Sequence, residues 1–116
     1  MNKTLILVLV LSAMVGCASD PAPNEQLRLT EQALTQARSA GASEQMAELT
    51  QAEQKLAAAI AAMKDADYRE ARLLAEQAEL DARLAEARML NEKSRLEMAE
   101  LGRRIARLRE QLGAIQ

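Results

Sequence analysis

The sequence predicts an all-α fold: a short antiparallel three-helix unit whose long third helix protrudes in the manner of a coiled coil. The chain from residue 24 onward is rich in Ala, Leu, Glu, Gln and Arg, which are strong helix formers. No Val, Phe or Trp follows residue 17, so a β-sheet would lack the residues it needs. Both prolines, Pro21 and Pro23, precede the helix-rich stretch and leave it uninterrupted.

The composition argues against most kinds of chemistry. The 116 residues include no His, one Cys and a single aromatic residue, Tyr68. Because active sites and metal sites usually draw on those residue types, we expect no enzyme, no metal site and no small-molecule substrate. Asp65 and Asp67 are interpreted as turn and capping residues rather than as an acid–base pair. The net charge of -2 gives no general attraction for nucleic acid, which we do not expect as a partner.

The N-terminus has the layout of a secretory signal. Lys3 is followed by an apolar run from Leu5 to Val15, and Gly16 and Cys17 come directly after it. A helix that crosses a bilayer needs roughly 20 apolar residues, so this run is too short for a permanent transmembrane span. We therefore predict a signal peptide over residues 1–16.

The sequence MVGC that ends at Cys17 resembles the lipobox of bacterial lipoproteins, although Leu is commonest where Met14 stands and Ala or Ser where Val15 stands. The resemblance implies that Cys17 carries a thioether-linked diacylglycerol and an N-acyl chain, and we expect no other cofactor. Two or more acyl chains anchor a protein stably to a membrane. Ala18 and Ser19, rather than Asp, follow the cysteine, which by the same resemblance implies the outer membrane, facing the periplasm. The alternative is an ordinary signal peptide followed by a free thiol.

The chain after the signal begins with a tether. Residues 17–23 contain the lipidated cysteine and both prolines, so an extended backbone is expected there. The helical domain follows over residues 24–112. Asn24 is the expected N-cap of a first helix over residues 25–39, and Gly41 is its expected C-cap. The apolar or small residues on the inner face of this helix recur every three or four positions, at Leu27, Thr30, Leu34 and Ala37.

A second amphipathic helix is predicted over residues 44–64, with Ser43 as its N-cap. Its apolar face comprises Met46, Leu49, Leu56, Ile60 and Met63.

The third helix is predicted over residues 67–111. Asp67 and Glu70 have the spacing of a capping box at its start. At 1.5 Å per residue the helix is roughly 67 Å long, so two shorter antiparallel neighbours can cover only about its first 20–25 residues. The part after about residue 91 is therefore expected to have no partner within the chain, and residues 113–116 form a C-terminal tail.

The third helix fits a heptad frame. The a positions are Leu84, Asn91, Met98, Ile105 and Leu112, and the d positions are Leu73, Leu80, Ala87, Ser94, Leu101, Leu108 and Ile115. The most regular part, which we call the partner seam, comprises Met98, Leu101, Ile105, Leu108 and Leu112. A helix without tertiary packing is marginally stable and its apolar stripe faces water, so the pattern predicts association.

The partner is either a second copy of the chain or another envelope protein. Asn91 at an a position suits a parallel dimer, but such a dimer would place like charges opposite each other, in the pairs Glu76–Asp81, Arg83–Arg88 and Arg104–Arg109. An antiparallel pair, a higher oligomer or a different, acidic helix avoids these pairs. Arg95, Arg104 and Arg109 flank the seam and favour the acidic helix.

The C-terminal arginines have two interpretations. Cations in the last turns of a helix complement its dipole. The functional alternative is an accessory module that binds an anionic envelope ligand, such as lipopolysaccharide or a cell-wall polymer, through Arg103, Arg104, Arg107 and Arg109.

The stretches NEQLRLTEQALTQARSAGA and LTQAEQKLAAAIAAMKDADYREARLLAEQAELDARLAEAR resemble the bacterial lipoprotein family known as domain of unknown function 4398, over about residues 17–112. The resemblance implies an envelope location and a helical module, and the family has no established activity to carry over. The run DADYREARLLAEQA also looks like a tetratricopeptide helix pair, but a solenoid needs several repeats and one is visible. We therefore expect a non-enzymatic, outer-membrane-anchored periplasmic lipoprotein that acts as a structural or adaptor element.

Overall fold

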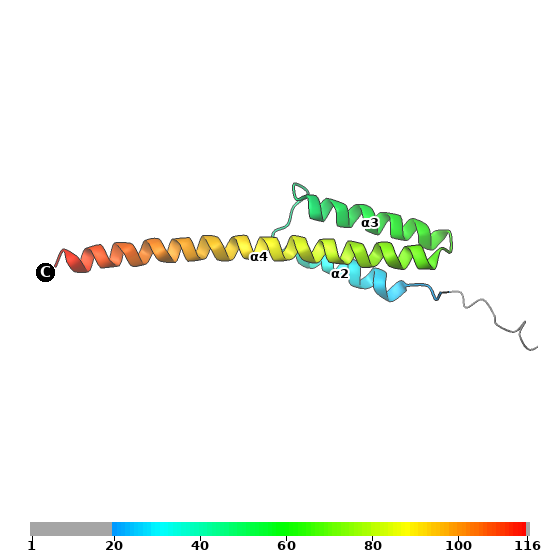
Figure 1. Ribbon diagram of the computed structural model, residues 1–116, viewed down its shortest axis with the longest axis horizontal. Helices are drawn as coiled ribbons and strands as arrows, with labels where there is room; N and C mark the ends of the chain where they lie inside the picture. Colours follow the sequence, from blue (N-terminus) through cyan, green and yellow to red (C-terminus); the bar gives the residue numbers. More distant parts are fainter. Residues whose placement is uncertain (1–19, 116) are drawn as a thin grey trace, which may run out of the picture.

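The computed structural model describes residues 20–115, which contain three α-helices and no β-strand (Figure 1). The helices are α2 (Asn24–Ala40), α3 (Ala47–Lys64) and α4 (Tyr68–Gly113). The helix α4 is far longer than α2 and α3, so the predicted elongated all-α fold with a long third helix is confirmed. The expected signal peptide and the lipidated Cys17 lie outside the described residues.

Both ends of α2 are set by local backbone chemistry. Pro23 is the N-cap and no side chain caps this end, so the prediction of Asn24 as N-cap is wrong by one residue: Asn24 is already helical. At the other end Gly41 has a left-handed backbone with φ 110°. Its N–H donates to the Arg38 carbonyl and the Ala42 N–H donates to the Ala37 carbonyl, each at 2.9 Å. This is a Schellman motif, and the predicted role of Gly41 is confirmed.

The start of α3 differs from the prediction by three residues. The N–H of Met46 donates to the carbonyl of Ser43 at 2.9 Å, which closes a turn over residues 43–46. Met46 is the N-cap and has an extended backbone, and no side chain caps the helix. Ser43 is therefore a turn residue rather than the expected N-cap, and the helix begins at Ala47.

The start of α4 is capped by the predicted residue, but the capping box is not closed, because the Asp67 N–H donates to the Ala62 carbonyl at 2.9 Å rather than to Glu70. Asp67 is the N-cap and its Oδ1 accepts a hydrogen bond from the Glu70 N–H at 3.2 Å. The helix then runs without interruption for 46 residues, through Gly102, to Gly113. At 1.5 Å per residue it is about 69 Å long.

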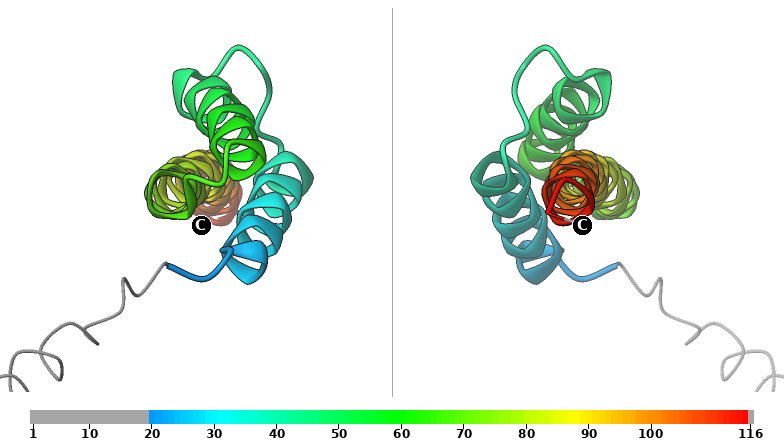
Figure 2. Two further views of the ribbon diagram at one scale, coloured as in Figure 1. Left: turned by 90° about the vertical axis from the view of Figure 1, so that its right-hand side faces the viewer. Right: turned by 90° about the vertical axis from the view of Figure 1, so that its left-hand side faces the viewer.

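The helices α2 and α3 lie along only the first half of α4 (Figure 1), and the end-on views show both of them on one side of it (Figure 2). α3 runs antiparallel to α4, whereas α2 runs in the same direction as α4 (Figure 1). The last residue of α4 that the bundle covers even in part is Met89, and every described residue after it is exposed. The prediction that coverage ends near residue 91 is therefore confirmed.

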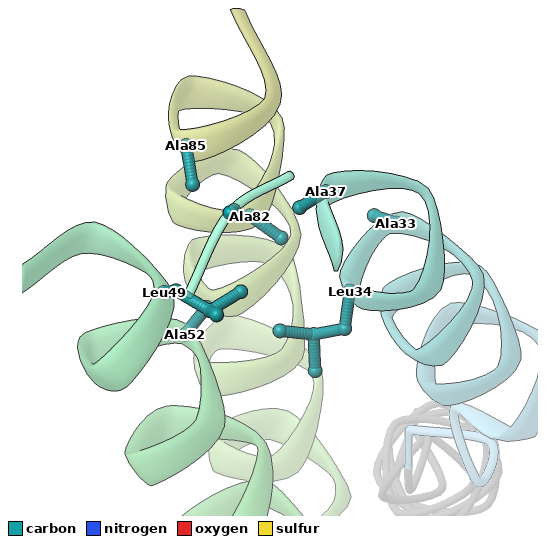
Figure 3. Packing of buried hydrophobic residues seen from close by; sticks show 8 residues of the cluster. Ala33, Leu34, Ala37, Leu49, Ala52, Ala82 and Ala85 are labelled. Carbon is teal, nitrogen blue, oxygen red and sulfur yellow. The ribbon is translucent and has the colours of Figure 1, made fainter. Parts of the chain in front are cut away.

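The core between the three helices consists mainly of alanine. The side of α4 that faces α2 and α3, which we call the alanine face, is fully buried and comprises Ala71, Ala75, Ala78, Ala82 and Ala85. Buried residues of the other two helices pack against it, among them Leu34 and Ala37 of α2 and Leu49 and Ala52 of α3 (Figure 3). Small side chains let the three backbones approach closely. The buried Thr30 hydroxyl accordingly donates to the carbonyl of Ala75 on α4, at 2.9 Å.

The predicted buried faces of the two shorter helices agree with the structure only in part. Thr30, Leu34 and Ala37 of α2 are buried as expected, and Leu27 is half-buried. Of the set predicted for the second helix, however, only Leu49 is fully buried, while Leu56 and Met63 of α3 and its N-cap Met46 are half-buried and Ile60 is exposed. Ala52 and Ala59 occupy the centre of the interface instead, because large side chains do not fit where the helices lie closest.

Candidate interaction face on α4

The helix α4 carries a second apolar stripe on the side opposite to the alanine face. Leu80 is 67% exposed and Leu84 is 45% exposed, whereas Ala78 and Ala82, two residues before each of them, are fully buried. Residues two apart point to nearly opposite sides of an α-helix. We call this stripe the leucine face; its large side chains are Leu73, Leu80, Leu84, Met98, Leu101, Ile105, Leu108, Leu112 and Ile115.

The leucine face follows the predicted heptad frame along the whole of α4. In the bundle half, α2 and α3 pack against alanines and leave the heptad leucines Leu73, Leu80 and Leu84 exposed. The sequence pattern did not show that the bundle uses a different face. A signal was nevertheless present, since Ala recurs at the helical spacing of four and three residues from Ala71 to Ala85.

The structure places all five residues of the predicted partner seam on this face, in the projecting half of the helix. Met98, Leu101, Ile105, Leu108 and Leu112 are between 41 and 70% exposed. They continue the line of leucines that begins beside the bundle. A partner helix could therefore contact one stripe from Leu73 to Ile115, whose middle positions are Ala87, Asn91 and Ser94.

The projecting half of α4 receives little support from the rest of the chain. Among the described residues after Met89, ion pairs join Arg95 to Glu92, at 3.5 Å, and Arg104 to Glu100. Exposed pairs of this kind contribute about 0.3–0.5 kcal/mol each. An isolated helix of this length is only marginally stable in water, so a partner would stabilise it considerably.

Charged residues border the leucine face where the bundle lies. Asp81 Oδ2 accepts from Lys55 Nζ of α3 at 2.5 Å, and Arg88 pairs with Glu48 of the same helix. On the other border Glu79 accepts a hydrogen bond from Gln26 Nε2 of α2 at 2.6 Å. These contacts fix the borders in place and leave the apolar stripe between them open.

The four C-terminal arginines do not form one patch. Arg104 pairs with Glu100. With 3.6 residues per turn, Arg104 and Arg109 lie on the two borders of the leucine face, while Arg103 and Arg107 lie on the opposite side of the helix. The structure therefore brings the partner seam together on one surface but distributes the proposed anion-contact residues around the helix.

The described residues contain no group of three or more His, Cys, Asp or Glu side chains that could hold a metal ion. Their surface hollows are open grooves, such as the one lined by Glu97, Glu100, Leu101 and Arg104 on α4 alone. The hydrogen bond from the Arg28 guanidinium lowers the pKa of the Glu25 carboxyl, and both side chains are exposed on α2. None of the described helices is long and apolar enough to cross a membrane.

The fold and the leucine face define an elongated, all-helical protein in which a short bundle supports one projecting helix. The profile of the domain of unknown function 4398 (DUF4398) matches residues 25–101, and the chain belongs to this family. It is also similar to a solved structure, the crystal structure of a DUF4398 family protein from Pseudomonas aeruginosa PAO1. The two chains are 56% identical with a TM-score of 0.80, over 83% of this chain and 100% of the other. No curated protein sequence matches the chain.

Proposed function

We propose that the protein is a non-enzymatic lipoprotein, anchored in the outer membrane and facing the periplasm, that presents α4 as a structural or adaptor element of the cell envelope. The observation that carries the proposal is the leucine face, most of all its projecting half, which no other described part of the chain covers. The lipobox-like sequence before Cys17 and the membership of the DUF4398 family support the envelope location.

The exposed stripe supports an interaction role on energetic grounds. Burial of a Leu, Ile or Met side chain stabilises a protein by about 1.5–3 kcal/mol. The nine large side chains of the leucine face are exposed and gain only part of this free energy. Soluble monomers rarely keep contiguous apolar surface of this kind without a use for it. The alignment of the residues on one helix face is typical of recognition by another helix.

The shape of the molecule supports the idea of an anchored element. The tether enters α2 at one end of the rod and the C-terminal end of α4 lies at the other (Figure 1). With lipid on Cys17, α4 would carry its partner seam away from the membrane, by about 45–65 Å from the start of the helix at 1.5 Å per residue. The bundle then serves as a base for the projecting helix.

Mass spectrometry of the protein extracted from cell membranes tests the anchoring. We expect the N-terminus at Cys17, with the added mass of a diacylglycerol and an N-acyl chain, in the outer-membrane fraction. The Cys17→Ser variant should lack both the lipid and this location. A wild-type protein with an unmodified Cys17 would refute the proposal.

Photo-crosslinking in cells tests the interaction role. A photoreactive residue at position 101, on the leucine face, should give discrete crosslinked products. The matched control places it at Leu96, which is similarly exposed, at 61% against 58%, but lies on the other side of α4. Equal products from both positions, or none from position 101, would contradict the proposed use of the leucine face.

One observation supports the alternative function, contact with an anionic envelope ligand. Arg103 and Arg107 lie one turn apart on the side opposite to the leucine face, and neither pairs with a carboxylate among the described residues. If this function holds, Arg103→Gln with Arg107→Gln should weaken binding to lipopolysaccharide vesicles, and added salt should release the protein. The control variant Arg69→Gln removes an exposed arginine at the bundle end of α4.

A further inference from the structure

We propose that the partner of the leucine face is a second copy of this chain, paired parallel and in register along α4 from Leu73 to Ile115. The inference rests on the proposed function, in which this face binds a partner. It goes further by assigning the occupant, its direction and its register.

The length of the leucine face favours a partner with a helix as long as α4. The stripe runs over about 60 Å at 1.5 Å per residue. Because α2 and α3 pack on the alanine face, Leu73, Leu80 and Leu84 stay available beside the bundle. A short helix of another protein would cover the partner seam and leave these three leucines in water. The α4 helix of a second copy covers all of them.

The two polar positions within the stripe specify direction and register. In a parallel, in-register pair each residue at an a or d position meets its own copy, so Asn91 meets Asn91 and Ser94 meets Ser94. A shift by one heptad would place Asn91 against Leu84 or Met98 and leave its amide among apolar side chains. Parallel pairing also places both tethers at the same end, as anchoring in one membrane requires.

The structure removes most of the charge repulsion that the sequence predicts for this dimer. In the pair Glu76–Asp81, Asp81 is already held by Lys55 at 2.5 Å. In the other two pairs, Arg83 is held by Glu79, Arg88 by Glu48 and Arg104 by Glu100. Each of the three like-charge pairs thus contains at least one side chain that is neutralised within its own chain. The remaining repulsion between screened surface charges is weak.

The area of the leucine face is sufficient for a stable dimer. Its nine large side chains are 41–80% exposed, and each offers on the order of 50–100 Å² of apolar surface. Together they offer on the order of 600 Å², and the aliphatic stems of flanking Arg and Glu residues add to it. Specific, stable interfaces bury about 600–1,000 Å² per partner, and the leucine face reaches this range.

The bundle does not obstruct the second copy. Figure 2 shows α2 and α3 on one side of α4, with the other side open. In the dimer the two α4 helices lie at the centre and the shorter helices lie outside. A straight helix drifts by about 20° per heptad, so pairing over the full length requires a left-handed supercoil of the two α4 helices.

Sedimentation equilibrium of the full chain in density-matched detergent tests whether the partner of the leucine face is a second copy. We expect the mass of two copies, and we expect Leu101→Glu to weaken the dimer by roughly tenfold or more, since it places a carboxylate in the seam. Leu96→Glu, on the opposite side of α4, should leave the dimer unchanged. Tyr68 fluorescence and far-ultraviolet circular dichroism verify that each variant keeps its bundle.

A wild-type monomer at every concentration would overturn the inference. If position 101 still crosslinks to another protein in cells, the proposed function stands and only the identity of the partner is wrong.

Cysteine crosslinking in the full chain with Cys17→Ser tests the direction. Leu101→Cys should give a disulfide-linked dimer on mild oxidation, because position 101 meets itself, and Leu96→Cys should not. A crosslink between Leu101→Cys and Leu84→Cys or Leu112→Cys, without the 101–101 product, would show an antiparallel pair and overturn the parallel arrangement.

Discussion

The two halves of α4 both carry leucines, but alanine is concentrated in the first half and the surroundings of the two halves are opposite. In the half beside the bundle, alanines at five positions are fully buried against α2 and α3. In the half after Met89, every described residue is exposed. The difference shows that the intrachain core is built from small side chains and close backbones, while the leucines of the same helix stay outside it. Hydrophobicity alone therefore does not predict which face of a helix is buried.

The largest expected difference between the two regions is the effect of truncating a leucine. Leu49 is 1% exposed in the bundle, so Leu49→Ala should lower the free energy of unfolding by about 2–5 kcal/mol. Leu101 is 58% exposed, so at protein concentrations low enough to keep the chain monomeric Leu101→Ala should change the stability of the bundle by less than about 0.5 kcal/mol. Urea unfolding followed by the fluorescence of Tyr68, at the bundle end of α4, measures both. Similar losses would contradict the division of the helix into two regions.

Enlarging an alanine gives the next largest effect. Ala82 is fully buried on the alanine face, so Ala82→Leu should overpack the interface and cost about 1–3 kcal/mol. Ala106 is exposed in the projecting half, and Ala106→Leu is the matched control with no expected cost. The urea midpoints of the two variants compare them directly. If Ala82→Leu were tolerated equally well, the helices would not be as closely packed as the structure shows.

Alanine substitutions at the glycines of the two regions should change the stability in opposite directions. Gly41→Ala places a Cβ on a backbone with φ 110°, 3.4 Å from Met89 Cε, and should destabilise the bundle by about 1–2 kcal/mol. At Gly102 nothing lies within 4 Å of an added Cβ, so Gly102→Ala should stabilise the projecting helix by about 0.5–1 kcal/mol. Thermal unfolding followed by circular dichroism measures both changes. A change in the same direction at both glycines would contradict the different surroundings of Gly41 and Gly102.

The smallest expected effect concerns the Glu25–Arg28 pair on α2. The hydrogen bond from Arg28 lowers the pKa of Glu25 below its ordinary value, so the stability that the pair contributes is present above the ordinary pKa and is lost as the pH falls through the lowered pKa. Because both side chains are exposed, Glu25→Gln should leave the urea midpoint at pH 7 almost unchanged. A clear shift at pH 7 would mean that the pair is shielded from solvent.

Much of the fold was predictable because it depends on local chemistry. Gly41 ends α2 and Asp67 starts α4 through backbone and capping interactions within a few residues, and helix length alone limits how much of α4 the bundle covers. The buried face of α4 was not predictable in the same way. The sequence holds an alanine stripe and a leucine stripe on opposite sides, and only the packing of three helices together selects between them. The start of α3 was missed because the turn at Ser43 competes with helix initiation there.

Hydrogen exchange along α4 tests most directly whether the leucine face is an interface. In the full-length wild type at high protein concentration, we predict that the amides of residues 91–113 are protected almost as strongly as those of residues 71–89. Dilution or Leu101→Glu should remove the protection of the projecting half and leave the bundle half unchanged, while Leu96→Glu should alter neither. Fast exchange after residue 90 at every concentration, in cell extract as well as in purified protein, would contradict the account, because the projecting helix would then have no partner.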